Sequence, residues 1–200
     1  MLKFGNETIA KVFAGTNEIA KVYLGGDLVY EKETGGTAEF IVWTGKTDVT
    51  ETAGSSLQIN ASGSWNGKAY STQQAAAGAV EAEFLTGTLR EESHAIIGLI
   101  NEGAAAGAGY FDLPFGIFNY LGLIYRLESG SVGLIGGTAS DADVLGIRYT
   151  AGGDIEYLLN GVVIATLEDA VINYPVKAIA FLQETGSSQP SKMENCKITF

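Results

Sequence analysis

Residues 154–167 read DIEYLLNGVVIATL, and this stretch indicates the fold class more clearly than any other part of the chain. Two apolar runs, 155–159 and 162–167, flank the pair Asn160-Gly161. A type I′ turn needs positive φ at both central positions, which Asn and Gly tolerate, so this pair between two strand-like runs predicts a β-hairpin. We therefore expect two antiparallel strands joined at Asn160 and Gly161.

Strand-like segments continue on both sides of this hairpin. One segment alternates, with Val80, Ala82 and Phe84 on one face and Glu81 and Glu83 on the other. The chain has 27 glycines but only three prolines, which fits many tight turns. We predict an all-β protein, a sandwich or a barrel, with no long helix. Further strands are expected at residues 39–43, 95–100, 121–127, 131–135, 144–150, 177–182 and 192–200.

A ten-residue repeat occupies the first thirty residues and is marked by Gly5, Gly15 and Gly25. Alternating side chains between these glycines favour three short strands, and a glycine every ten residues argues against the alternative of an amphipathic helix. A short repeat that cannot bury its own face normally packs on its copies or on a partner. We expect assembly contacts from the apolar and aromatic residues of the repeat: Ile9, Val12, Phe13, Ile19, Val22, Tyr23, Leu28 and Tyr30.

The chain therefore divides into three parts. Residues 1–32 are expected to form the β-repeat anchoring module, residues 33–38 a polar linker and residues 39–200 a β-sandwich. Two hundred residues suit one medium-sized domain with a small appendage. The larger part is long enough to bury a core without disulfides or a structural metal.

Composition narrows the classes of partner. A net charge of -11 argues against binding nucleic acid or an anionic membrane surface, since both need clustered Lys and Arg. No signal peptide opens the sequence and no apolar run approaches the ~20 residues of a membrane helix, so we expect a soluble chain made in the cytoplasm, with no membrane insertion. The single cysteine, Cys196, lies in an expected strand and is predicted to be a small buried hydrophobe.

Residues 40–200 resemble the concanavalin A-like lectin/glucanase jelly roll, a sandwich of two sheets. The resemblance rests on a GSWNG turn at residues 63–67 and an AIIGL strand at residues 95–99. It also rests on the Asn160-Gly161 hairpin and on the final strand, residues 193–199. The expected fold is therefore a two-sheet jelly roll behind the N-terminal repeat.

Residues 19–31, IAKVYLGGDLVYE, resemble short modules of bacteriophage structural proteins that join a fibre or tip protein to the virion. Such modules paired with lectin-like sandwiches are similar to phage tail-fibre, head-fibre and decoration proteins. The resemblance implies attachment to other virion proteins through the repeat. Because its strand edges are open to pairing with other chains, we expect a homo-oligomer and favour a trimer.

No catalytic constellation is predicted. His94 is the only histidine, and no serine lies in a nucleophile-elbow motif. A glycosidase needs two carboxylates facing each other across a groove, and Glu81 with Glu83, or Asp154 with Glu156, are the candidates. Glucanases of this fold typically carry a Glu-x-Asp-x-x-Glu strand, which is absent here, and alternating acids are typical of a solvated face.

Sugar rings stack on aromatic side chains, so the ligand candidates are aromatic residues in loops with polar neighbours. The predicted set consists of Trp65, Asn66, Tyr70, Tyr110 and Asp112. Trp65 has an alternative role as a core anchor at a corner of the sheet.

The sequence predicts no cofactor but leaves Ca²⁺ open. Lectins of the legume type bind sugar beside Ca²⁺ with Asp and Asn oxygens. Asp141 and Asp143 place two carboxylates at alternate positions, and an ordinary Asx turn is the alternative.

Together these features predict a non-enzymatic surface protein of a bacteriophage virion. The repeat would anchor it, and the sandwich would adhere to a host-surface glycan. The alternatives are a capsid or tail decoration without a ligand, and a glycan hydrolase.

Overall fold

The computed structural model describes backbone and side chains of residues 36–60, 65–86, 94–140, 142–183 and 191–200, the backbone of Ser93 and Glu184, and the backbone of the strands within residues 2–31. The chain forms two compact units, Met1–Gly36 and Thr37–Phe200.

The N-terminal unit contains three separate two-stranded antiparallel sheets, so the expectation of three single strands is wrong. Each sheet is a hairpin whose strands are joined by two residues, the first of them a repeat glycine. Each of the three repeats therefore corresponds to one complete two-stranded hairpin. The hairpin strands are β1 (Leu2–Phe4) with β2 (Glu7–Ile9), β3 (Phe13–Ala14) with β4 (Asn17–Glu18), and β5 (Lys21–Leu24) with β6 (Asp27–Glu31).

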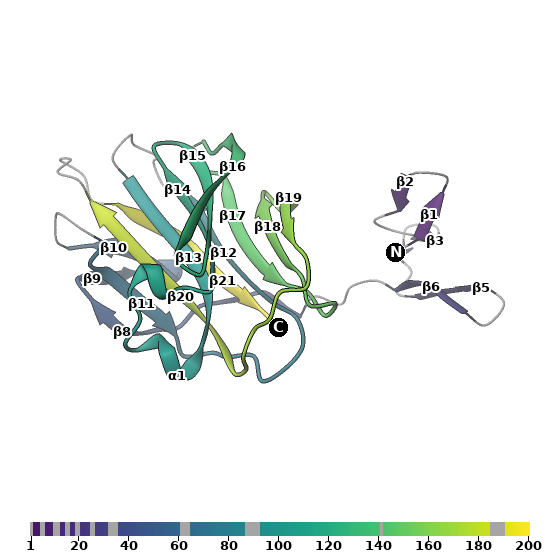
Figure 1. The fold of residues 1–200 in the computed structure, drawn as a ribbon, viewed down its shortest axis with the longest axis horizontal. Coiled ribbons are helices and arrows are strands. Elements are labelled where there is room, and N and C mark those ends of the chain that lie inside the picture. Colours follow the sequence, from purple (N-terminus) through teal and green to yellow (C-terminus); the bar gives the residue numbers. More distant parts are fainter. Residues whose placement is uncertain are drawn as a thin grey trace. The chain divides into compact units, whose positions relative to one another are not determined.

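The second unit is a sandwich of two antiparallel sheets, as the sequence predicts (Figure 1). The eight-stranded sheet has the order β19-β18-β17-β12-β21-β10-β9, and β7 also pairs with β21. Its strands are β7 (Glu39–Phe40), β9 (Val49–Thr52), β10 (Ser56–Ile59), β12 (Val80–Thr86), β17 (Val144–Tyr149), β18 (Ile155–Leu159), β19 (Val162–Leu167) and β21 (Lys192–Thr199).

The seven-stranded sheet has the order β16-β15-β14-β13-β20-β11-β8. Besides the strands, the unit contains the short helix α1 (Glu102–Ala105) and the 3₁₀ turns η1 (Ala53–Ser55) and η2 (Tyr110–Asp112). The strands of this sheet are β8 (Trp43–Thr47), β11 (Gly67–Ser71), β13 (Ser93–Asn101), β14 (Phe115–Tyr120), β15 (Leu123–Glu128), β16 (Ser131–Thr138) and β20 (Val176–Glu184).

The hairpin predicted at residues 154–167 is confirmed. Strands β18 and β19 pair across the turn, and Asn160 and Gly161 have φ of 52° and 74°. The alternation predicted for β12 is also confirmed, because Val80 and Phe84 are each 1% exposed in the core between the sheets. Cys196 is buried in the same core, as predicted.

The strand expected at residues 39–43 is divided between the two sheets. Phe40 pairs with β21 in one sheet, whereas Trp43 begins β8 in the other. The Gln73 side chain substitutes for a strand at the crossing, since its Nε2 donates to the Phe40 carbonyl at 2.8 Å and its Oε1 accepts from the Val42 N–H at 2.9 Å. A side chain that satisfies the backbone in this way leaves no periodic signal in the sequence.

Candidate functional site

A second apolar cluster covers the outer face of the seven-stranded sheet, opposite the sandwich core. Successive side chains of a strand point to opposite faces. Along β13, Ile97 and Leu99 therefore join the core between the sheets, while Ile96 and Ile100 join the outer cluster. The buried members of this outer cluster are Ile96, Ile100, Ala105, Ala108, Leu113, Phe118, Leu127, Ile179 and Phe181.

Residues 101–114, which we call the covering segment, pack over part of this outer face. Gly98 of β13 and Gly116 of β14 lie opposite each other, and their missing side chains leave a notch. Leu113 is fully buried and fills this notch: a Cβ on Gly98 would lie 3.0 Å from Leu113 Cδ1, and one on Gly116 would lie 3.4 Å from it. Two adjacent glycines thus determine where the covering segment docks.

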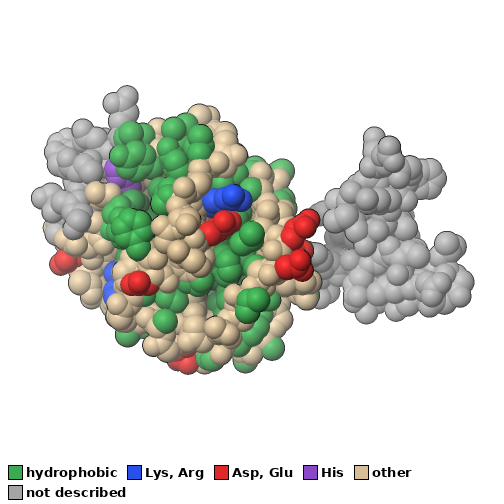
Figure 2. All heavy atoms as spheres, in the orientation of Figure 1, with side chains coloured by type: hydrophobic (Ala, Val, Ile, Leu, Met, Phe, Trp, Pro, Cys, Tyr) green, Lys and Arg blue, Asp and Glu red, His purple; other side chains and the backbone are tan. Residues whose placement is uncertain are grey.

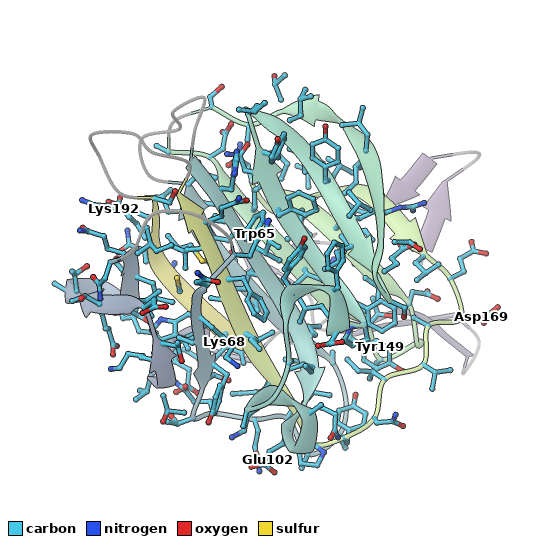
Figure 3. The ribbon with its side chains drawn as sticks, turned by 60° about the vertical axis from the view of Figure 1, so that its left-hand side comes forward. Trp65, Lys68, Glu102, Tyr149, Asp169 and Lys192 are labelled. Carbon is cyan, nitrogen blue, oxygen red and sulfur yellow. The ribbon has the colours of Figure 1, made fainter. Side chains whose placement is uncertain are left out.

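Two lysines of the sheet bind the covering segment. Lys68 Nζ donates to the carbonyl oxygens of Ala106 and Ala108, at 2.8 and 3.2 Å. Lys177 Nζ lies 3.2 Å from Glu102 Oε1 of α1. Figure 3 shows Lys68 below Trp65 in that view, with Glu102 near the lower end of the sheet. The segment is therefore held at its backbone and at α1, while its aromatic end faces Trp65.

A pocket of about 240 Å³ opens beside the covering segment. Its wall includes Trp65 from the turn before β11, and Tyr110 and Phe111 from η2. Among the described residues, six aromatic and three aliphatic side chains line it: Trp65, Tyr110, Phe111, Phe118, Tyr120, Tyr125, Ile96, Leu127 and Val132.

The aromatic rings of the pocket form a continuous set of contacts. The Trp65 ring centroid lies 5.3 Å from that of Tyr110 and 6.1 Å from that of Phe118. Phe118 stacks on Tyr125 at 5.1 Å, and Tyr125 meets Tyr120 edge-on at 6.1 Å. Such contacts stabilise one another and preorganise the rings before any ligand arrives.

His94 lies between two rings of the pocket, 4.2 Å from Tyr120 and 5.9 Å from Trp65 between centroids. Figure 2 shows it in purple next to hydrophobic side chains. Its Nδ1 lies 3.2 Å from Gln183 Oε1, whereas its buried Nε2 has no hydrogen-bond partner among the described residues. Burial lowers the pKa of His94, and the contact with Gln183 opposes this shift only in part. The ring is therefore neutral at neutral pH.

The described side chains that line the pocket are uncharged, but three of them are tyrosines that end in a hydroxyl group. No Asp, Glu, Lys or Arg belongs to this described lining. Among the described residues, no hydrogen bond engages the hydroxyls of Tyr110, Tyr120 and Tyr125. Phe111 and Tyr120 are 55% and 39% exposed, so the mouth is open to solvent. The arrangement suits a neutral ligand that is apolar on one side and rich in hydroxyls on the other.

The structure brings together two of the five predicted ligand residues, Trp65 and Tyr110. Tyr70 packs against the outer cluster but is not part of the pocket lining, and Lys177 Nζ lies 5.7 Å from its ring centroid. Asp112 Oδ2 accepts from the Gly109 N–H at 2.8 Å and so closes the η2 turn. Asn66 is exposed and outside the pocket lining.

Sequence reasoning missed most of the sheet-borne pocket residues. Phe118 and Tyr120 lie in β14, a strand that was not predicted. Apolar residues alternate at Phe118 and Tyr120 across Asn119, which is the one signal that would have identified an aromatic face.

The predicted metal ligands are engaged elsewhere or lie outside the described residues. Asp143 Oδ2 accepts from the Ser140 N–H at 2.6 Å, and its Oδ1 accepts from Asn160 Nδ2 at 2.8 Å. The hydrogen bonds from Asn160 and from the Ser140 N–H lower the pKa of Asp143 and engage both of its carboxylate oxygens within the protein. Asp141 lies outside the described residues, and the described part of the chain contains no cluster of three or more metal-ligating side chains.

The carboxylates considered for hydrolysis lie away from the pocket. Glu81 and Glu156 both pair with Arg148, through Nη1 at 3.3 Å and Nη2 at 2.5 Å. Glu83 pairs with Lys197 at 3.5 Å. All three glutamates belong to strands of the eight-stranded sheet, whereas the pocket lies on the other sheet, so none of them faces the pocket.

Other predicted features of the chain have mixed outcomes. The assembly residues Ile9, Phe13, Val22, Tyr23, Leu28 and Tyr30 belong to hairpin strands of the N-terminal unit. Val12 and Ile19 lie outside the described residues. In the described part of the chain, no helix has the length and apolar character needed to cross a membrane.

The sandwich has the concanavalin A-like lectin/glucanase jelly-roll fold, which it shares with several solved domains. The carbohydrate recognition domain of Emp46p, in a mutant form, aligns with a TM-score of 0.56 and 12% identity over 78% of this chain and 87% of that one. The SPRY domain of human HERC1 aligns with a TM-score of 0.56 and 14% identity, covering 76% of this chain and 91% of that one.

A legume lectin-like domain from Entamoeba histolytica aligns with a TM-score of 0.51 and 14% identity, covering 76% of this chain and 86% of that one. Identities this low establish a common fold only. No protein-family model and no curated protein matches the sequence.

Proposed function

We propose that this chain is a bacteriophage surface protein that binds a neutral host-surface glycan through the aromatic pocket. Its N-terminal hairpins would attach it to other virion proteins. The single observation that carries the binding function is the pocket itself, an uncharged group of aromatic rings with hydroxyl tips on an open sheet face.

Carbohydrates have the chemistry that this lining fits. A pyranose ring presents C–H groups on its faces and hydroxyls around its rim, so it stacks on an aromatic side chain while its hydroxyls form hydrogen bonds. Trp65 and Tyr110 supply ring faces, and the Tyr120 and Tyr125 hydroxyls supply donors and acceptors. The carbohydrate recognition domain of Emp46p has the same fold, which supports a glycan over other small neutral ligands.

We propose binding without catalysis. A glycosidase needs an acid and a second carboxylate on opposite sides of the bound sugar. No carboxylate belongs to the described lining of the pocket, and the sequence candidates Glu81 and Glu156 pair with Arg148 on the other sheet.

Virion attachment is supported by the N-terminal unit. Residues 19–31 resemble attachment modules of phage structural proteins, and β5 with β6 forms one of three independent hairpins there. An isolated two-stranded hairpin is marginally stable in water, so hairpins of this kind gain order from a partner. We propose other virion proteins and further copies of this chain as those partners, with a trimer favoured.

The glycan-binding proposal is tested by a glycan array followed by calorimetry with the best binder. Trp65→Ala and Phe111→Ala remove pocket rings, and we expect Trp65→Ala to weaken binding about tenfold or more because it removes a stacking face. Phe40→Ala is the matched control for Phe111→Ala, since the two side chains are 53% and 55% exposed and Phe40 lies on the other sheet.

Circular dichroism shows whether each variant remains folded. If Phe40→Ala and Phe111→Ala lowered the affinity for the glycan equally, the glycan would not bind at the pocket. A wild-type chain that binds nothing on the array would favour a decoration protein without a ligand.

A further inference from the structure

The pocket differs in chemistry between its floor and its mouth. At the floor, Phe118 and Val132 are 6% and 51% exposed and present only apolar groups, beside the buried Ile96 and Leu127. At the mouth, the hydroxyls of Tyr110 and Tyr120 provide polar contacts. A ligand that enters therefore places its innermost group against hydrocarbon and its outer groups against hydroxyls.

We infer that the pocket selects neutral sugars that carry a methyl group, which it seats on the Phe118 and Val132 floor. The methyl belongs either to a 6-deoxyhexose or to the acetamido group of an N-acetylhexosamine. This inference rests on the proposed glycan-binding function and adds the class of sugar to it.

The size and charge of the pocket support one small neutral ring. Its volume of about 240 Å³ lies below the ~300–1,000 Å³ of sites that enclose drug-sized ligands, so one sugar residue occupies it and further residues lie outside. The described lining has no cation to pair with the carboxylate of an acidic sugar. The net charge of -11 repels such sugars from the whole chain.

The floor discriminates through the cost of burying a hydroxyl. A hydroxymethyl group against Phe118 and Val132 loses its hydrogen bonds to water and gains none, whereas a methyl group gains apolar burial. One small group in an apolar pocket changes affinity by about 10–200-fold. We expect the methyl-bearing sugar of a matched pair to bind at least about tenfold more tightly.

The experiment titrates the wild-type chain, labelled with ¹³C at Ile, Leu and Val methyl groups, with three pairs of free sugars. The pairs are L-fucose with L-galactose, L-rhamnose with L-mannose, and N-acetyl-D-glucosamine with D-glucose. The first two pairs test a 6-deoxy methyl and the third tests an acetamido methyl. We expect the preferred sugar to shift the methyl signals of Ile96, Leu127 and Val132, and to leave Val162 of the other sheet unchanged.

A matched pair of variants tests the apolar floor of the pocket. Val132→Thr replaces a methyl with a hydroxyl at the floor, and Val162→Thr makes the same change on β19. Both valines lie on edge strands and are 51% and 64% exposed, so both variants are expected to fold. We expect Val132→Thr to reduce the preference for the methyl-bearing sugar and Val162→Thr to preserve it.

The outcomes separate this inference from the proposed function. If both members of every pair bind equally and Trp65→Ala abolishes the binding, the selectivity for methyl groups is wrong and glycan binding stands. If no sugar of the three pairs binds, or binding leaves the pocket methyl signals unchanged, this inference fails. Continued binding of array glycans would then keep the broader function.

Discussion

Gly98 lies in the middle of β13, at a position where the neighbouring residues leave no room for a side chain. A Cβ at this position would lie 2.7 Å from the Phe115 carbonyl oxygen and 3.0 Å from Leu113 Cδ1. The first of these contacts would displace the adjacent strand β14, and the second would displace the covering segment. Gly98 therefore couples the sheet to the docking of residues 101–114.

We predict that Gly98→Ala destabilises the sandwich by about 1–3 kcal/mol, since overfilling a packed site forces its neighbours to move. Gly107→Ala is the control, because a Cβ there would meet nothing within 4 Å and the residue does not have a positive φ. Urea unfolding measures both, and the control is expected to stay within about 0.5 kcal/mol of wild type. Equal stability of the two variants would show that the notch tolerates a methyl group.

At this scale the sequence predicts local geometry well and tertiary neighbours poorly. Asn160 and Gly161 encode their turn because positive φ is a property of each residue. Trp65 and Tyr110 were identified as ligand candidates from their residue types alone. Their contact, with ring centroids 5.3 Å apart, depends on how the covering segment crosses the sheet, which no local pattern contains.

The covering segment is the element on which the pocket depends most. Its residues 102–109 are mainly glycine and alanine, so the sequence shows almost no side-chain signal there. The structure explains this composition, because Lys68 binds the segment through the carbonyls of Ala106 and Ala108, and not through side chains. Small residues allow Lys68 and the sheet to approach the backbone closely.

We predict that Lys68→Met loosens the covering segment without unfolding the sandwich. The methionine side chain replaces the apolar stem of the lysine, but the two hydrogen bonds from its charged ammonium group are lost. A hydrogen bond that involves a charged group contributes about 1.5–3 kcal/mol to stability, and this is the upper limit for each of the two. Hydrogen exchange measures the result, and the amides of residues 102–112 are expected to exchange about tenfold faster or more.

Lys46→Met is the control for this change, because Lys46 Nζ pairs with Glu51 at 2.8 Å on an exposed surface. Its exchange pattern at residues 102–112 should match that of wild type. Unchanged protection in Lys68→Met would mean that Leu113 and the alanines hold the segment alone. Sugar binding is a second measurement on Lys68→Met. Weaker binding than wild type would show that Tyr110 and Phe111 contact the sugar only when the covering segment is docked on the sheet.

At the scale of the whole molecule, every strand pairing of the sandwich lies within residues 39–199. Periodicity predicts the all-β class, as a sandwich or a barrel, because burial of one face of a sheet imposes alternation on strands such as β12. The two-sheet jelly roll is predicted from the family resemblance. The division of residues 39–43 between the sheets was not predicted, since it depends on Gln73 from a distant part of the chain.

We predict that a chain beginning at Thr37 is a folded monomer, while the full chain is a homo-oligomer, with a trimer favoured. The reason is that each N-terminal hairpin is a separate two-stranded sheet, which needs a partner for stability. Light scattering on both chains measures the masses, and thermal unfolding checks that the sandwich is equally stable in each. Two monomers would contradict an assembly role for the hairpins.

The three hairpins also determine how the length of the chain can vary. Each completes its strand pairing within about ten residues and shares no strand with its neighbours. A duplication or deletion of ten residues there adds or removes one whole hairpin and leaves every register of the sandwich unchanged. We therefore expect the number of hairpins to change in steps of ten residues while the sandwich retains its sequence.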